Sequence, residues 1–200
     1  AATALLMLVL ATIACRERTP PVPKVIETAA ALSADNPLIA EVRVALDREA
    51  RVYVEYENAG AGKFRTATTT AAGTEHRVPL VRLRASTSYS YLAFAVDPEG
   101  RKTEGVGGAL TTGRLPKPLA TLDFEVAGRP TSELVMMDHR DRDGGYYLVL
   151  DQDSQIVWYY RSPNPIAGTV FGVQTIRQKP DYNLVYYLGR PPLPCCLREI

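Results

Sequence analysis

The chain has 200 residues, with 23 basic and 22 acidic side chains and a formal net charge of +1. Nucleic-acid binding usually requires a basic excess, so this balance argues against a nucleic-acid partner. Hydrophobic residues make up 46% of the chain, which excludes global disorder. The 15 prolines and 14 glycines, together with abundant Val, Thr and Tyr, favour an all-β fold. The three cysteines are too few for a disulfide scaffold.

Residues 1–15 have the composition of a targeting segment. An apolar run starts at Leu5 and ends in Ala14-Cys15, and it is shorter than the roughly 20 residues that a membrane-spanning helix needs. The Ala-Cys end resembles a bacterial lipoprotein signal, in which Cys15 would carry a lipid that attaches the chain to the membrane. An ordinary secretory signal is the alternative. Both interpretations place the mature chain outside the cytoplasm, in the periplasm or at the cell surface.

Residues 16–33 are predicted to be a Pro-rich tether. The run Thr19-Pro20-Pro21-Val22-Pro23 favours an extended polyproline II spacer. A spacer between a lipid anchor and a folded module would let the module clear the lipid headgroups.

Residues 34–114 carry the pattern of a β-sandwich. Val42, Val44 and Leu46 alternate with other residues in the period of two that marks a half-buried strand, and a turn is predicted at residues 47–49. Short strands separated by turn signals at roughly 8–12 residue spacing are typical of a sandwich. Strands are predicted at residues 42–46, 52–56, 66–70, 76–81, 88–97 and 109–113.

Residues 83–91, with Phe94 and a turn at residues 97–100, resemble the fibronectin type III family. In that family a Leu and a Tyr at this spacing form the tyrosine corner, in which the Tyr hydroxyl bonds back to an upstream backbone group. The resemblance implies that Leu83 is buried and that Tyr89 is the corner tyrosine. A module of this kind is a spacer or a docking surface, and the sequence favours a spacer.

Residues 120–200 predict a second β unit made of hairpins. One hairpin joins residues 145–150 to 155–160, and another joins 172–176 to 184–188. Tyr doublets recur at residues 146–147, 159–160 and 186–187. Because neighbours on a strand point to opposite faces, each doublet places aromatic surface on both sides of its sheet, as packed blades require. The predicted fold is therefore a sandwich followed by the first blades of an incomplete β-propeller.

Residues 147–160, which contain Trp158 in a W-x-Y motif, resemble a blade hairpin of the bacterial arylsulfate sulfotransferase family. Residues 172–188 match its next blade strands. The resemblance implies transfer of a sulfuryl group from a phenolic sulfate ester to a phenol, through a covalent sulfo-His intermediate. Aryl sulfates and phenols are the implied small-molecule partners, and no cofactor is implied. The alternative is a non-enzymatic surface protein that uses both modules for adhesion or binding.

No residue of this chain is predicted to be catalytic, and the family's His is expected downstream. His76 falls on a predicted surface strand, and His139 falls in a charged loop at residues 137–141, so both are expected to be structural or solvated.

No metal site is predicted. An EF-hand at residues 141–144 fails because His139 and Leu150 stand at ligand positions, although a looser calcium turn stays open. Cys195 and Cys196 lack zinc-site spacing. They could form a vicinal disulfide, pair elsewhere or simply be buried.

Overall fold

A computed structural model gives the fold, and it describes residues 20–124, 133–141, 144–161, 172–178, 184–190 and 193–199. Most of this described chain is β-strand, and the helix in it is the four-residue α1 (Lys117–Ala120). The prediction of a mainly β chain is therefore confirmed. Within the described ranges, no helix has the length and apolar character to cross a membrane. The predicted targeting segment and its Cys15 lie outside the described residues.

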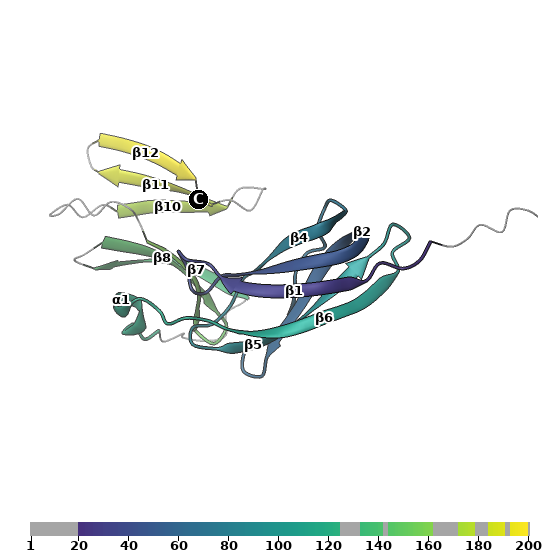
Figure 1. Ribbon diagram of the computed structural model, residues 1–200. Coiled ribbons are helices and arrows are strands. Elements are labelled where there is room, and N and C mark those ends of the chain that lie inside the picture. Colours follow the sequence, from purple (N-terminus) through teal and green to yellow (C-terminus); the bar gives the residue numbers. More distant parts are fainter. Residues whose placement is uncertain are drawn as a thin grey trace, which may run out of the picture.

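The first β unit is a sandwich whose two antiparallel sheets share one long strand, β2 (Figure 1). The first half of β2 pairs with β1 and β4, and its second half pairs with β3 and β5, to which β6 is added. The strands are β1 (Val25–Leu32), β2 (Ala40–Asn58), β3 (Gly62–Arg65), β4 (Gly73–Leu80), β5 (Ser88–Val96) and β6 (Lys102–Thr111).

Strand β2 passes from one sheet to the other at residues 47–50, where the sequence predicts a turn. Its register with β4 shifts between Ala45 and Ala50, and its pairing with β5 covers residues 51–57. The backbone stays extended at this corner because Asp47 is bonded twice to Lys24. The Lys24 N–H donates to Asp47 Oδ1 at 2.8 Å, and the Asp47 N–H donates to the Lys24 carbonyl oxygen at 3.0 Å. The predicted turn is thus a bend within a continuous strand.

The apolar residues that alternate with a period of two fill the space between the two sheets. Alternate residues of β2 and β5 point inward and are buried, which removes their apolar surface from water. The core is made of Val25, Ala40, Val42, Val44, Leu46, Ala50, Val52, Val54, Tyr56, Val78, Leu80, Leu83, Tyr89, Tyr91, Ala93 and Ala95.

Strand β1 lies inside the segment predicted as a tether, so that prediction is wrong for residues 25–32. The strand pairs antiparallel with β2, from Val25↔Leu46 to Leu32↔Ala40. Only Val25 of β1 is buried, and the Ala-rich remainder has weak β propensity, so the segment carries no clear period of two. The sandwich therefore begins at Val25, and residues 20–24 are extended chain without strand pairing.

A second sheet follows the sandwich and consists of β7 (Leu134–Asp141), β8 (Gly144–Asp151) and β9 (Ile156–Arg161). The β8–β9 hairpin agrees with the predicted one. Strand β7 replaces the charged loop that was predicted around His139, which lies opposite Tyr146 in the register. The charged residues of this segment mask its strand character in the sequence, because pairing with β8 determines its conformation.

A third sheet contains β10 (Gly172–Gln178), β11 (Leu184–Arg190) and β12 (Leu193–Glu199), all antiparallel. The β10–β11 hairpin agrees with the second predicted hairpin. Cys195 and Cys196 lie on β12, and their side chains are outside the described ones, so their pairing stays a prediction. The propeller also stays a prediction, because two three-stranded sheets do not form a ring.

Strands β1 and β6 approach each other closely at Gly105. A Cβ atom on Gly105 would lie 2.3 Å from the Cβ of Val25 and 2.9 Å from the carbonyl oxygen of Ala93. The contact therefore requires a residue without a side chain at this position.

Substitution Gly105→Ala is expected to lower the free energy of unfolding by about 1–3 kcal/mol, because the new methyl group forces β1 away from β6. Urea unfolding of the purified protein measures the change. Gly73→Ala is the matched control, since its nearest neighbour would be 3.6 Å from the new Cβ. Equal stabilities of the two variants would contradict the close approach.

Candidate functional site

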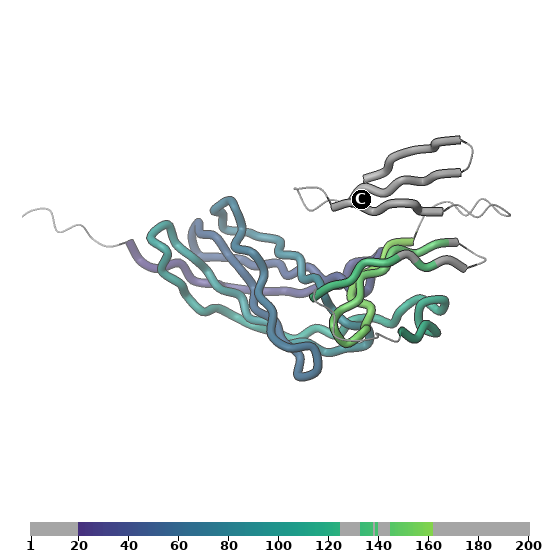
Figure 2. Tube along the Cα trace, turned by 180° about the vertical axis from the view of Figure 1, so that it is seen from behind, coloured from purple at the N-terminus to yellow at the C-terminus, as the bar shows by residue number. Residues whose placement is uncertain are grey.

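One end of the sandwich meets the β7–β9 sheet in a shared apolar cluster. Figure 2 shows β7–β9 and α1 gathered at the same end of the sandwich, opposite the start of β1. Leu38 comes from the sandwich and Leu119 from α1, and both are fully buried. The buried members are Leu38, Leu119, Tyr146, Leu148, Leu150, Ile156 and Tyr159, with Ala85, Leu115, Leu122, Phe124 and Met137 packed against them. This cluster, together with the polar contacts described next, is called the junction.

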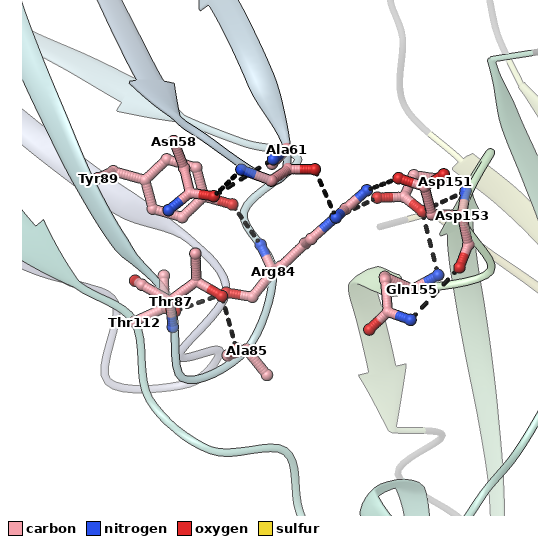
Figure 3. A network of polar contacts seen from close by, with 11 residues as sticks. Asn58, Ala61, Arg84, Ala85, Thr87, Tyr89, Thr112, Asp151, Asp153 and Gln155 are labelled. Atoms are coloured by element: carbon pink, nitrogen blue, oxygen red, sulfur yellow. Dashed lines mark hydrogen bonds and ion pairs between the residues drawn. The ribbon is translucent and has the colours of Figure 1, made fainter.

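Arg84 is the polar centre of the junction (Figure 3). Its Nε donates to Asp151 Oδ2 at 2.7 Å, and its Nη2 donates to Asp153 Oδ2 at 2.5 Å. A third bond runs from Nη1 to the carbonyl oxygen of Gly60 at 2.9 Å. The side chains of Arg84 and Asp151 are only 18% and 14% exposed, so this ion pair is largely shielded from water. One side chain of the sandwich thereby binds two residues of the β8–β9 turn.

The β8–β9 turn is shaped by Asp151 itself. Its Oδ1 accepts hydrogen bonds from the N–H groups of Asp153 at 2.9 Å and Gln155 at 3.0 Å. Ser154 has a φ of 61°, the left-handed conformation that a tight turn requires here. The two oxygens of Asp151 therefore have separate tasks: one forms the turn, and the other binds Arg84.

The tyrosine corner positions the backbone of Arg84. Leu83 and Tyr89 are fully buried, and the Tyr89 hydroxyl accepts a hydrogen bond from the Arg84 N–H at 2.9 Å. On the other side, Thr112 Oγ1 donates to the carbonyl oxygen of Arg84 at 2.5 Å. Because both backbone groups of Arg84 are held, its side chain leaves the sandwich in a defined direction. The residues that stabilise the sandwich thus also aim Arg84 at the second sheet.

Asn36 makes a second polar link across the junction. Its Nδ2 donates to the carbonyl oxygen of Tyr159 at 2.8 Å, and its Oδ1 accepts from the Leu38 N–H at 2.9 Å. The side chain is buried, so these bonds satisfy groups that would otherwise be costly to remove from water. Sequence reasoning missed Asn36, because its partner lies 123 residues away.

The ionisation of the junction groups follows from their surroundings. Burial works to lower the pKa of the Arg84 guanidinium, but its hydrogen bonds with Asp153 and Asp151 outweigh burial and raise that pKa, so Arg84 stays charged. Burial raises the pKa of the Tyr89 hydroxyl. The neighbouring Tyr56 hydroxyl donates to the Val81 carbonyl oxygen at 2.7 Å, and burial raises the pKa of Tyr56 to about 12. Both tyrosines are therefore neutral hydrogen-bonding groups at physiological pH.

The polar groups of the junction hold the two β units together. A cavity of about 200 Å³ lies beside Arg84, and Arg82 and Glu133 on its wall form an ion pair at 3.0 Å. The lining residues include no His, Ser or Cys nucleophile next to a base. Among the described residues, no group of three or more His, Cys, Asp and Glu could hold a metal ion. The arrangement positions two β units relative to each other.

His76 and Trp158, both singled out in the sequence, lie outside the set of residues that forms the junction. His76 Nε2 lies 2.9 Å from the Ala50 carbonyl oxygen and 3.0 Å from that of Gly73, so it is engaged with backbone. Trp158 lies on β9 opposite Val149, and its ring lies 6.5 Å from that of Tyr160 at 12°. Trp158 therefore contributes to the aromatic surface of the second sheet.

Tyr89→Phe is expected to lower the free energy of unfolding by about 1 kcal/mol, because the Arg84 N–H loses its acceptor. Chemical denaturation measures this change. Tyr91→Phe is the matched control, since Tyr91 lies on the same strand and its hydroxyl has no hydrogen bond to any described residue. The tyrosine corner would have no energetic role if both substitutions cost the same.

Arg84→Met is expected to lower the free energy of unfolding by about 2 kcal/mol, because Asp151 is left shielded from water without its cation. Hydrogen exchange should also accelerate at the amides of Asp153 and Gln155, which donate to Asp151. Arg77→Met is the control, since Arg77 pairs only with exposed Glu41. A double-mutant cycle with Asp151→Asn measures the coupling energy between the two side chains. A coupling energy of zero would contradict a role of this ion pair in holding the two β units together.

No family model matches the chain, and no curated protein matches it. Among solved structures, the chain is similar to a fibronectin type III domain of human collagen XX, at 16% identity and a TM-score of 0.32. The match covers 47% of this chain and 93% of that domain.

Proposed function

We propose that residues 20–124 form a rigid stalk that holds a following β domain in an exported arylsulfotransferase-like protein. The single observation behind the stalk is the junction, where Arg84 and a continuous apolar cluster bind the β7–β9 sheet to one end of the sandwich. The chain enters the sandwich at the opposite end, where β1 starts (Figure 1). A stalk with this layout separates the N-terminal attachment from the second β unit.

The contacts of the junction favour a fixed orientation over a flexible linkage. Polar and small contacts between domains usually permit relative motion. Here the apolar cluster combines Leu38 and Leu119 with side chains of β8 and β9, and the partly buried Arg84 adds directional bonds. An ion pair that is removed from water tolerates little displacement, because each charge then loses its compensation.

The β7–β9 sheet has apolar side chains on both faces, as a stacked sheet requires. One face, with Leu148 and Tyr159, packs in the junction. Met136 and Trp158 lie on the opposite face, since Val149 pairs with both in the register. In a closed propeller every blade contacts two others. Because the sandwich already covers one face, we place β7–β9 at the start of the blade-like region.

The sulfuryl transfer is proposed from the resemblance of residues 147–160 to an arylsulfotransferase hairpin. A His nitrogen would attack the ester sulfur, forming an N–S bond while the S–O bond to the aryl group breaks and the phenolate takes a proton. A second phenol, losing its proton, would then attack the sulfo-His and regenerate the His. His76 is bonded to backbone carbonyls, and His139 lies on β7 opposite Tyr146. We therefore propose that the nucleophile is a His downstream of residue 200.

The proposal includes export and lipid attachment at Cys15. The apolar run before Cys15 supports both. Attachment through Cys15 would place the entering end of the sandwich nearest the membrane and the junction farthest from it.

The activity is tested with the full-length protein and 4-nitrophenyl sulfate. We expect release of 4-nitrophenol that depends on added phenol, together with phenyl sulfate in equal amount, because the sulfuryl group must reach an acceptor. Mass spectrometry of enzyme quenched without phenol should show a sulfated His.

Two controls separate the parts of this proposal. Arg77→Met should keep the full rate, and Arg84→Met should lower it only if the orientation of the second unit matters for catalysis. Absence of turnover and of a sulfated His in the folded protein would refute the transferase. It would then favour the alternative of a non-enzymatic surface binding protein.

A further inference from the structure

The register of the strands gathers three basic residues around one aromatic pair on the outer face of the sandwich. Arg51, Val96 and Lys102 are direct cross-strand neighbours on β2, β5 and β6. Tyr53 and Phe94 form the next row, and their rings are stacked with centroids 4.8 Å apart at 6°. Residues directly opposite each other in antiparallel strands share a face. The set Arg51, Tyr53, Arg65, Phe94 and Lys102 is called the basic–aromatic face.

Two of its cations contact the same ring. The Arg65 guanidinium carbon lies 3.9 Å from the centroid of Tyr53, and Lys102 Nζ lies 5.9 Å from it. Tyr53 is buried beneath these side chains, whereas Arg51, Arg65 and Lys102 are exposed. The aromatic pair thus supports a small cluster of solvent-facing positive charge.

These cations differ from most others of the sandwich in having no ion pair. Within the described part of the chain, Arg51, Arg65 and Lys102 have no carboxylate at ion-pair distance. Every one of the following cations does have such a partner: Arg43, Arg48, Lys63, Arg77, Arg82, Arg84 and Arg101. Cations without an ion pair can bind an external anion without first breaking one.

Three acidic groups belong to the same face and reduce its charge. Glu104 lies opposite Phe94, Glu55 lies opposite Arg65, and Glu57 lies opposite Lys63. Glu55 is engaged by Lys63 Nζ at 2.9 Å, so its charge is compensated. The remaining excess is positive and is concentrated at the row of Arg51 and Lys102.

This row lies at the end of the sandwich where the chain enters. Arg101 Nη2, next to Lys102, donates to the Pro20 carbonyl oxygen at 3.1 Å, and Arg48 Nη1 donates to that of Pro21 at 3.3 Å. Four residues lie between Cys15 and Pro20, so five residue steps join them, a reach of at most about 17 Å. With Cys15 anchored, the basic–aromatic face is held close to the membrane surface.

We propose that the basic–aromatic face binds anionic phospholipid headgroups and so fixes the tilt of the stalk on its membrane. The inference rests on the proposed lipid attachment in one respect: that attachment brings the face to a membrane, which supplies the anionic headgroups. Arg and Lys side chains placed against an anionic bilayer bind its surface charge. The buried Tyr53 ring supports two of these side chains from below.

The test uses the full-length protein without residues 1–15, so that no lipid anchor contributes. Flotation should show binding to phosphatidylglycerol vesicles, weak binding to phosphatidylcholine vesicles, and loss of binding at high salt. The variant Arg51→Glu with Lys102→Glu should bind phosphatidylglycerol at least about tenfold more weakly, because each basic residue near an anionic surface contributes about fivefold. Arg43→Glu with Arg77→Glu, an equal charge change on the other sheet, should bind like the unmodified protein.

Three outcomes would overturn the inference. The first is an equal loss of phosphatidylglycerol binding in the two double variants. The second is equal binding of the unmodified protein to both kinds of vesicle. The third is retention of the protein on a sulfated polysaccharide column without vesicle binding. Thermal unfolding of each variant confirms that it is folded. The assay contains no aryl sulfate, so its result is independent of turnover. Failure of the transferase leaves vesicle binding intact, and failure of vesicle binding leaves turnover intact.

Discussion

The contact between Arg84 and Asp151 is the interaction on which the arrangement of the two β units depends. Arg84 belongs to the tyrosine corner of the sandwich, and Asp151 forms the turn of the next sheet. Both side chains are largely shielded from water, so neither charge can lose its partner without a substantial cost. The orientation of the β7–β9 sheet therefore follows from the rigidity of the corner that carries Arg84.

The apolar and polar parts of the junction contribute differently to the contact between the two β units. Burial of Leu38, Leu148 and Tyr159 supplies a non-directional driving force that would tolerate many relative positions of the two units. The hydrogen bonds of Arg84 and Asn36 are directional and are satisfied only in one arrangement. Affinity between the units thus comes from the cluster, and specificity of orientation comes from the polar contacts.

The sandwich has distinct roles at its two ends. At the end where the chain enters, Arg48, Arg101 and Asp47 form hydrogen bonds with residues 20–24. The opposite end carries the junction. Between these ends, β2 runs through both sheets and ties them into one body. A fold of this type does not specify an activity by itself. In the proposed enzyme its role is mechanical, because it fixes the following β unit relative to the proposed lipid anchor.

Much of the fold could be predicted from the sequence because alternation is a local signal. The period of two along β2 and β5 identified the core strands, and the spacing of Leu83 and Tyr89 identified residues that prove to be buried. Strand β1 was missed because its Ala-rich residues bury little, so nothing local distinguishes it from a tether. Its state depends on pairing with β2, which local composition does not encode.

The candidate site was decided only by the tertiary structure. Asp151 and Asp153 have the sequence character of a solvated turn, and Arg84 that of an ordinary surface arginine. The fold brings Arg84 to Asp151 across 67 residues of chain, and Asn36 to Tyr159 across 123. The sequence by itself determined most of the core strands and their apolar faces, because those properties arise between near neighbours. Strands β1 and β7 depend instead on pairing with β2 and β8. Which strands meet, and therefore which charges pair, depends on the path of the chain as a whole.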